Sequence, residues 1–441
     1  MIFDNVAELK RYWSKHIFSL PAIVKNQLSM IVDPVLFMQL YFVGQDKKDT
    51  SNIAHHGFYN KQDYIEMLYA YAGLGGEQLS QERIDEIKHR ISELSDEKKV
   101  LLKVTDLKQW FPLKKTKLFQ KEQEYVRAND GITLNIYEGE TVGLVGESGC
   151  GKSVTSQCLM RLNPEPPGFF EGGEILYKGK DVLKMNKKEL RQFRGKEISY
   201  IFQDPMTSLN PLYTIQRQME EVLILHEPQM NKAQRRERCI ELLHAVGIPN
   251  PEERLKEYPN QFSGGMRQRV MIAMALVCEP DILIADEPTT ALDVTIQAQI
   301  LELMQDLQKK LGMAIIMVTH DLGVIASMCD EIIVMYGGRV CERGTADAIF
   351  YHPAHEYTKG LLRSIPKADN MNEKLIPIGG TPINLLQMPE GCAFCPRCES
   401  AMKICLKQQP AEFRVGEDHL ASCWMNVKEI YEAQEGGSNE Q

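Results

Sequence analysis

The stretch that decides the fold is Gly146-Glu147-Ser148-Gly149-Cys150-Gly151-Lys152-Ser153, which fits the spacing G-x-x-x-x-G-K-[ST] of a phosphate-binding loop, or P-loop. An apolar strand-like run over 141–145 leads into it, and a helical pattern over 153–161 follows it. Glycines let the backbone turn so that its N–H groups point at phosphate oxygens, and the helix N-terminus adds partial positive charge. Lys152 can reach the β- and γ-phosphates, and the Ser153 hydroxyl suits Mg²⁺. The stretch therefore predicts a nucleotide site that ends near Val154.

The composition is ordinary for a soluble globular protein, because 43% of the 441 residues are hydrophobic and 25% are charged. This length leaves room for two or three domains. A net charge of -9 argues against a general nucleic-acid-binding surface. The most apolar early run, 35–43, is too short to cross a bilayer, and the first residues lack the pattern of a secretion signal. We expect any membrane role to come through partner chains.

The pattern along the chain predicts three regions. Residues 1–98 read as a helical N-terminal extension to which the sequence assigns no role. Strand-like and helical patterns alternate over 99–355, which predicts an α/β fold with a mostly parallel sheet and a ligand at the carboxyl ends of its strands. Within that region 164–173 reads as a loop and 205–262 as a helical subdomain. Residues 356–441 form a small tail region.

An acidic strand end is the second chemical motif. The apolar run 282–285 is followed directly by Asp286 and Glu287. In P-loop enzymes an Asp in this position holds Mg²⁺, and Glu287 is placed to accept a proton from an attacking water. A merely solvated acidic strand end is the alternative, but it does not explain why both acids follow four residues of buried type.

Further motifs resemble those of ABC-type ATPases and stand in that family's order along residues 100 to 355. They are Ile201-Phe202-Gln203-Asp204-Pro205 (Q-loop), Phe262-Ser263-Gly264-Gly265-Met266-Arg267-Gln268-Arg269 (signature motif), Ala291-Leu292-Asp293 (D-loop) and Val318-Thr319-His320-Asp321 (switch-histidine strand end). The resemblance implies the P-loop fold of ABC type and the binding and hydrolysis of ATP. Phe262 and Met266 depart from the Leu and Gln that are commoner in the wider family.

The resemblance also implies a role for each matching residue. The loop 146–154 would bind the phosphates of ATP. Glu287 would be the general base and His320 would contact the γ-phosphate, while Gln203 would sense the metal and the attacking water. The implied Mg²⁺ ligands are Ser153, Gln203 and Asp286. The residues implied to close on ATP held by an opposite ATPase subunit are Ser263, Gly264, Gly265 and Asp293.

An aromatic side chain that stacks on adenine is expected before the P-loop. Tyr125 is our prediction for it, with Phe119 and Trp110 as the alternatives.

Five of the eleven cysteines crowd into residues 392–423, namely Cys392, Cys395, Cys398, Cys405 and Cys423. Four thiolates from such a group can bind Zn²⁺ or an iron–sulfur cluster, whereas a disulfide framework is unusual in a reducing compartment. The pattern resembles the C-terminal region of ATP-binding subunits from di- and oligopeptide ABC importers. That resemblance implies a [4Fe–4S] cluster on Cys392, Cys398, Cys405 and Cys423, with Cys395 as an alternative ligand and Zn²⁺ as the alternative metal. Nothing in the sequence places this group near the ATP chemistry.

The resemblance implies an ATP-hydrolysing subunit on the cytoplasmic face of the cell membrane that energises peptide import. Its implied partners are two membrane permease subunits, a second related ATPase subunit and a solute-binding protein, without nucleic acid. Nickel or another small solute is an alternative cargo. A soluble ABC ATPase acting on DNA or ribosomes predicts basic patches or a second P-loop, and a non-catalytic regulator predicts the loss of Glu287 or His320. Neither prediction matches this sequence.

Overall fold

The computed structural model describes residues 99–113, 123–204, 208–290, 292–364, 377–416 and 418–427. The chain divides into two compact units, Met1–Lys99 and Val100–Gln441. The predicted N-terminal extension, 1–98, lies outside the described residues, as does Phe119.

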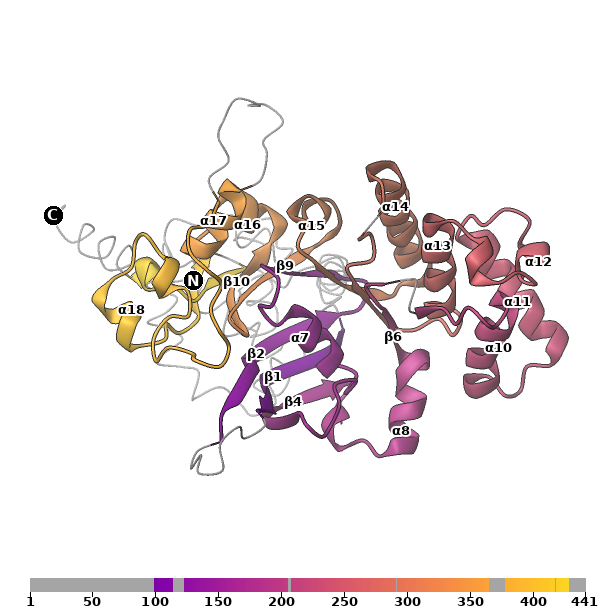
Figure 1. Ribbon diagram of the computed structural model, residues 1–441, viewed down its shortest axis with the longest axis horizontal. Helices are drawn as coiled ribbons and strands as arrows, with labels where there is room; N and C mark the ends of the chain where they lie inside the picture. The colour runs from indigo at the N-terminus through magenta and orange to yellow at the C-terminus, as the bar shows by residue number, and fades with distance from the viewer. Residues whose placement is uncertain are drawn as a thin grey trace, which may run out of the picture. The chain divides into compact units, whose positions relative to one another are not determined.

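A mixed eight-stranded sheet carries the P-loop (Figure 1). Its strand order is β11-β12-β10-β9-β3-β8-β7-β6, and the pairs from β9 through β3, β8 and β7 to β6 are parallel. The strands are β3 (Thr141–Val145), β6 (Ile198–Ile201), β7 (Ile282–Asp286), β8 (Ala314–Thr319), β9 (Glu331–Tyr336), β10 (Arg339–Thr345), β11 (Phe413–Gly416) and β12 (His419–Ala421). The predicted mostly parallel α/β sheet is confirmed.

A second, antiparallel sheet has the order β2-β1-β4-β5. Its strands are β1 (Val100–Pro112), β2 (Tyr125–Tyr137), β4 (Phe169–Tyr177) and β5 (Lys180–Asp181). The loop predicted over 164–173 is wrong in its second half, because β4 begins at Phe169 and pairs there with Trp110 of β1. The prolines and glycines of 164–173 are typical of a loop. Backbone pairing with β1 nevertheless makes 169–173 part of a strand.

The central strands are buried on both faces, which explains their continuous apolar runs. Along β7, Ile282 and Ile284 pack in the core shared with the antiparallel sheet, whereas Leu283 and Ala285 pack in the core on the opposite face. This alternation is the period of two expected for a strand. Two apolar cores therefore sandwich the sheet and fix its register.

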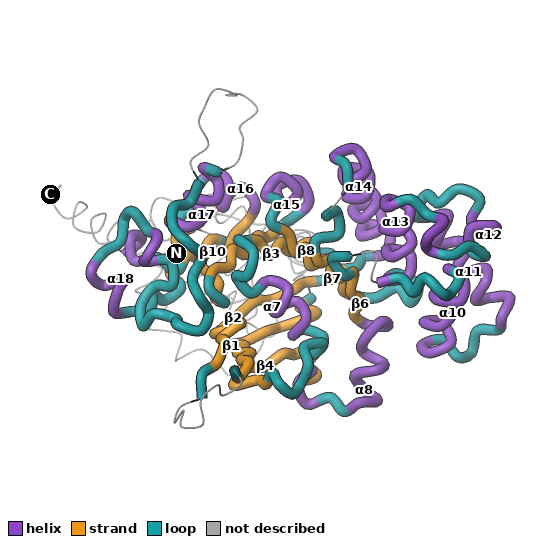
Figure 2. The backbone as a smooth tube through the Cα atoms, in the orientation of Figure 1, coloured by secondary structure: helices purple, strands orange, loops and turns teal. Residues whose placement is uncertain are grey.

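Most of the described helices pack on the face of the main sheet opposite β1, β2 and β4, whereas the helix that follows the P-loop packs in the core shared with the antiparallel sheet (Figure 2). The helices are α7 (Lys152–Cys158), α8 (Lys187–Gln192), α10 (Ile215–His226), α11 (Lys232–Ala245), α12 (Pro251–Arg254), α13 (Gly264–Ala275), α14 (Val294–Leu311), α15 (Leu322–Met328), α16 (Ala346–Tyr351), α17 (Glu356–Arg363) and α18 (Lys403–Lys407), with the short turns η1 (Val182–Lys184), η2 (Phe193–Glu197), η3 (Pro259–Gln261) and η4 (Cys395–Arg397). Within the Val100–Gln441 unit, helices α10 to α13 gather beyond β6, on the side away from α18 (Figure 1). Among the described residues no helix is both long and apolar enough to span a membrane.

The tail is joined to the main sheet through a buried carboxylate on β10. Glu342 has a fully buried side chain and accepts hydrogen bonds from the backbone N–H groups of Ala354 and His355 at 2.6 and 2.9 Å. Nε2 of His419, on β12, lies 2.6 Å from Oε1 of Glu342. Although burial by itself raises the pKa of Glu342, the bond to His419 and the backbone donors lower it. The carboxylate is therefore held ionised inside the protein by groups on both sides of the 365–376 segment.

Candidate functional site

The P-loop connects β3 to α7 through glycines in conformations that other residues avoid. Gly149 and Gly151 have φ values of 78° and 106°. A Cβ on Gly151 would lie 2.6 Å from the carbonyl oxygen of Ala128. The helix predicted over 153–161 begins one residue earlier and ends at Cys158. The loop is therefore a rigid turn whose N–H groups lead into a helix N-terminus.

The P-loop lysine is folded back on its own loop. Nζ of Lys152 donates to the carbonyl oxygens of Gly146 and Glu147 at 2.8 and 3.1 Å, and only 6% of the residue is exposed. Cys150 is buried beside it. The ammonium group is thus held at the loop, where a phosphate oxygen can replace the carbonyls as its partner.

Asp286, the last residue of β7, faces the start of α7. The Ser153 hydroxyl donates to its Oδ1 at 3.1 Å, and the Tyr200 hydroxyl on β6 donates to its Oδ2 at 2.8 Å. Burial raises the pKa of Asp286, while the bonds from Tyr200 and Ser153 oppose that shift. The hydroxyl and carboxylate are hard oxygen ligands of the kind that Mg²⁺ prefers. This donor set fits the magnesium site predicted from the sequence.

Glu287 stands at the centre of the site. Its backbone takes a φ of 48°, and its N–H donates to the carbonyl of Val318 at 2.7 Å. Its carboxylate accepts from Nε2 of Gln203 at 2.7 Å and from the Thr290 hydroxyl at 2.9 Å. Nδ1 of His320 lies 3.0 Å from its other oxygen. The ends of β6 and β8 and the turn after β7 therefore direct polar groups at one carboxylate.

These contacts decide the charge of Glu287. Burial, the largest single influence, raises its pKa, but the hydrogen bonds from His320 and Thr290 and the nearby charge of Lys152 together lower it. Its side chain is 14% exposed, whereas that of His320 is 59% exposed. An ionised, partly shielded carboxylate next to Asp286 has the charge state that a general base requires. The structure brings together Gln203, Asp286, Glu287 and His320 with Lys152 and Ser153.

Two of these partners escaped the sequence prediction. Tyr200 bonds to both Asp286 and Ser156, and Thr290 bonds to Glu287. Thr290 follows Glu287 by three residues, which is a recognisable spacing for a hydroxyl that caps a turn. Tyr200 carried no such signal, because only the pairing of β6 with β7 reveals its neighbour.

The signature motif forms the N-terminus of α13, where Ser263 and Gly264 are exposed while Phe262 is buried. Ser263 is the N-cap, and its hydroxyl accepts from the N–H of Met266 at 3.3 Å. A Cβ on Gly265 would lie 2.9 Å from the side chain of Ile296 on α14. Asp293 caps α14 by accepting from the N–H of Ile296 at 3.0 Å, while Ala291 lies outside the described residues.

Tyr125 belongs to an aromatic group at one end of the antiparallel sheet. Its ring centroid lies 5.8 Å from Trp110 and 5.6 Å from Phe169. Arg127 lies over the Trp110 ring at 4.8 Å. Contact with adenine stays a prediction for Tyr125 and for its alternative, Trp110.

The tail cysteines gather without forming a ligand set. The N–H of Cys392 donates to the carbonyl of Cys405 at 2.8 Å, and burial raises the pKa of Cys392 to about 11, with Cys405 and Cys423 adding to the shift. Burial likewise raises the pKa of Cys398 to about 11. Across the described ranges, no three His, Cys, Asp or Glu side chains are arranged to hold a metal ion. The predicted iron–sulfur cluster, and zinc as its alternative, are therefore not confirmed.

Comparisons with known proteins agree with this geometry. The family model described as ABC transporter matches residues 129–290, and that described as oligopeptide/dipeptide transporter, C-terminal region, matches residues 341–405. The chain is 53% identical over 300 residues to the dipeptide transport ATP-binding protein DppD of Bacillus subtilis, which covers 68% of this chain and 89% of that protein.

Two oligopeptide transport ATP-binding proteins are similarly close. OppD of Bacillus subtilis is 54% identical over 301 residues, covering 68% of this chain and 84% of that protein. OppD of Escherichia coli is 48% identical over 306 residues, covering 69% of this chain and 89% of that protein. All three relatives are named as ATP-binding proteins of dipeptide or oligopeptide transport.

Proposed function

This chain belongs to the ATP-binding proteins of ABC transporters, in the oligopeptide and dipeptide group, and we propose that it hydrolyses ATP to energise the import of di- or oligopeptides through partner permease subunits. The observation that carries the proposal is the environment of Glu287. Gln203 and His320 both contact its carboxylate, and Asp286 next to it bonds to the P-loop serine.

The proposed reaction uses these groups in named roles. The P-loop N–H groups and Lys152 bind the phosphates, while Ser153, Asp286 and Gln203 would hold Mg²⁺, which would supply positive charge to neutralise the phosphates. Glu287 accepts a proton from water as the water oxygen bonds to the γ-phosphorus, and the bond to the β–γ bridging oxygen breaks to release ADP. His320 holds Glu287 in place and contacts the γ-phosphate.

A second ATPase subunit completes the proposed site. Ser263, Gly264 and Gly265 are solvent-accessible at a helix N-terminus, which suits phosphate oxygens supplied by another chain. Each P-loop would then face the signature motif of its partner. This arrangement couples ATP binding to closure of the pair, and hydrolysis to its opening.

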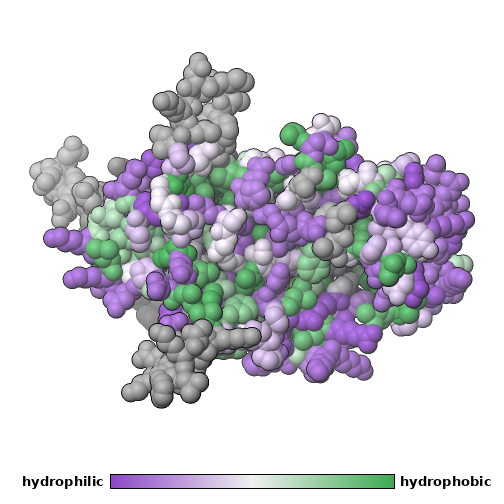
Figure 3. Space-filling view, in the orientation of Figure 1, coloured by the Kyte–Doolittle hydropathy of each residue, from purple (hydrophilic) through white to green (hydrophobic). Residues whose placement is uncertain are grey.

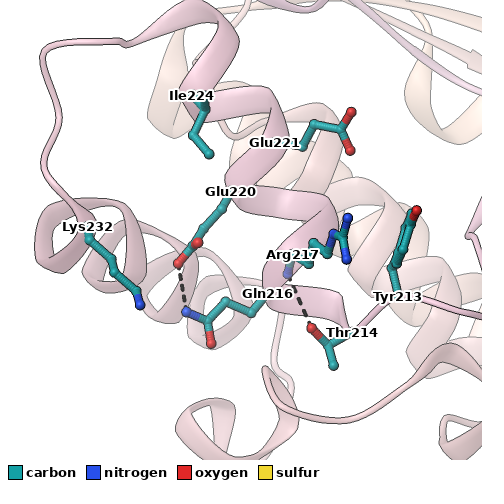
Figure 4. Close-up of a pocket in the computed structure, with 8 residues that line it drawn as sticks. All are labelled: Tyr213, Thr214, Gln216, Arg217, Glu220, Glu221, Ile224 and Lys232. Atoms are coloured by element: carbon teal, nitrogen blue, oxygen red, sulfur yellow. Dashed lines mark hydrogen bonds between the residues drawn. The ribbon is translucent and has the colours of Figure 1, made fainter.

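The permease contact is proposed on the helical subdomain, which begins beside Gln203. A pocket of about 490 Å³ opens along α10, lined by Tyr213, Arg217, Glu220 and Ile224 among others (Figure 4). Ile224, which lines this pocket, is 54% exposed, and Leu212, just before α10, is 79% exposed, although hydrophilic side chains dominate the visible surface of this region (Figure 3). A mixed apolar and charged surface of this kind suits a protein partner. It would hold the chain at the cytoplasmic face of the membrane.

Peptides are favoured over nickel as the cargo because of the names of similar proteins. The family model that matches residues 341–405 and the three relatives described above are named for oligopeptides or dipeptides. The proposed solute-binding protein and permeases would select among peptides. Purification of the tagged chain from gently solubilised host membranes tests the proposal. Two permeases, a second ATPase and a solute-binding protein are expected to accompany it, and ribosomes or DNA-repair proteins in their place would contradict it.

The tail cysteines have no assigned part in this reaction. An iron–sulfur cluster stays a prediction from the sequence, with zinc as the alternative. The mutual closeness of Cys392, Cys405 and Cys423 supports it, but these thiols would have to turn toward one point and lose their protons. Iron, zinc and acid-labile sulfide assays on the full chain, purified without oxygen, test it directly. A chain without any of them would withdraw the prediction.

A further inference from the structure

One side chain of the tail reaches the P-loop. Arg397, the last residue of η4, donates from Nη1 to Oε2 of Glu147 at 2.6 Å and from Nη2 to Oε1 at 3.0 Å. Only 4% of the Arg397 side chain is exposed, against 26% for Glu147. A two-pronged pair of this kind fixes both position and orientation. The tail is thus in direct contact with the ATP-binding loop, through a residue that the sequence did not single out.

The guanidinium group is held in place from several sides. Nε donates to the carbonyl of Gly379 at 2.8 Å, and Nη2 also donates to the carbonyl of Ile378 at 3.3 Å. Nη1 also donates to the Tyr336 hydroxyl at 3.4 Å. Every N–H donor of Arg397 therefore has a partner, in a geometry that a lysine cannot reproduce.

The backbone of Glu147 is held by the tail as well. Its N–H donates to the hydroxyl of Tyr357 on α17 at 2.8 Å. Tyr357 is fully buried, and its ring packs 4.7 Å from Tyr336 and 5.3 Å from Phe394, centroid to centroid. Both the side chain and the N–H of one P-loop residue therefore rest on an aromatic cluster shared by the main sheet and the tail.

Glu147 lies where its charge matters for ATP. Its carbonyl oxygen accepts from Nζ of Lys152, the group that reaches the phosphates. The carboxylate of this same residue, if it had no partner, would add negative charge to the loop and so repel the phosphate oxygens of ATP. Arg397 removes this repulsion and at the same time fixes the first turn of the loop.

We propose that Arg397 is a positioning residue for ATP binding, which neutralises and orients Glu147 so that the tail sets the affinity of the P-loop for ATP. This inference rests on the proposed function, since it concerns the same nucleotide site. Wild-type affinity for MgATP is therefore measured first, by calorimetry on the full chain. A wild-type chain that binds no ATP would refute the proposed function, whereas the variants below test Arg397.

In R397Q the carboxylate of Glu147 loses its partner, and we expect affinity for MgATP to fall by about tenfold. In the assembled transporter the KM for ATP should rise, while kcat changes by less than about twofold. The double variant E147Q/R397Q removes the uncompensated charge and should regain most of the lost affinity. A purely structural role for Arg397 predicts no such recovery.

The matched control is Arg343, which forms a two-pronged pair with Glu412 at 2.9 and 3.0 Å, away from the P-loop residues. R343Q should bind MgATP like the wild type. Its melting temperature should change by about as much as that of R397Q. Unchanged affinity in R397Q, an equal loss in R343Q, or no recovery in the double variant would overturn the proposal. If R397Q lacks a cooperative melting transition, R397K replaces it in the same comparison, with a smaller loss expected.

Discussion

Two groups of ligand-type side chains can be compared in this molecule, the acids and amides at the strand ends and the cysteines of the tail. The strand-end group is assembled, because β7 pairs with β6 and β8 in parallel and so brings Glu287 next to Gln203 and His320. The tail cysteines lie in loops and short helices. Among the described residues they are not arranged to hold a metal ion. Sheet register fixes geometry over several strands, whereas loop contacts depend on local packing that sequence spacing does not determine.

The largest expected effect comes from breaking the strand-end group at its centre. E287Q keeps the shape of the side chain but removes its basic oxygen, so turnover should fall by roughly 10²–10⁴-fold. ATP binding should be retained, because Lys152 and Ser153 are untouched. Steady-state ATPase assays and nucleotide titration of the assembled transporter measure both. Hydrolysis at the wild-type rate would remove Glu287 from the role of base.

A smaller effect is expected from changing Tyr200, which donates a hydrogen bond to Asp286 but was not predicted as a site residue. Y200F removes the hydroxyl that donates to Asp286 and leaves the ring, which packs 4.6 Å from Phe202. Because partners of metal ligands orient them, we expect half-maximal ATPase activity to need about tenfold more Mg²⁺. The control is S156A, which removes the other partner of Tyr200 and should shift the Mg²⁺ requirement far less. Equal shifts in both variants would contradict a specific role for Tyr200.

The cysteine side of the comparison is sharpened by a matched pair of variants. Cys395 and Cys423 are 7% and 9% exposed, so both should act as small buried hydrophobes. C395S and C423S should each lower the free energy of unfolding by about 1–3 kcal/mol, measured by urea denaturation. A far larger loss for C423S, accompanied by release of bound iron or zinc, would instead support the predicted ligand set.

The smallest expected effect concerns an acid at the start of β9, a neighbouring strand of the same sheet. Burial, with a contribution from Glu140, raises the pKa of Glu331 to about 7. Between its ordinary pKa and about 7 the native protein binds more protons than the unfolded chain, so this carboxyl lowers stability as pH rises. E331Q imitates the neutral acid and should melt higher than wild type at about pH 8, with little difference at about pH 5. The reverse order would show that Glu331 is stabilised as an anion.

The sequence predicted those parts of the molecule in which motif and register coincide. Four site residues come directly after a buried strand or a glycine turn, namely Lys152, Ser153, Asp286 and Glu287. Their closeness in the fold could therefore be predicted. The sequence did not predict the start of β4 or the contact of Tyr200 with Asp286. Each depends on pairing with a strand that is distant in the sequence. Arg397 and Glu147 are 250 residues apart, so no local sequence pattern predicts their ion pair.

The buried Glu342 constrains how the chain can be recombined with its relatives. Its ionised side chain sits in the main sheet, while one of its partners, His419, comes from the far end of the tail. A tail borrowed from another protein without a histidine in that place would leave a buried anion short of a partner, which is strongly destabilising. Positions 342 and 419 must therefore be exchanged together, which makes the pair a compatibility rule for chimeric transporters.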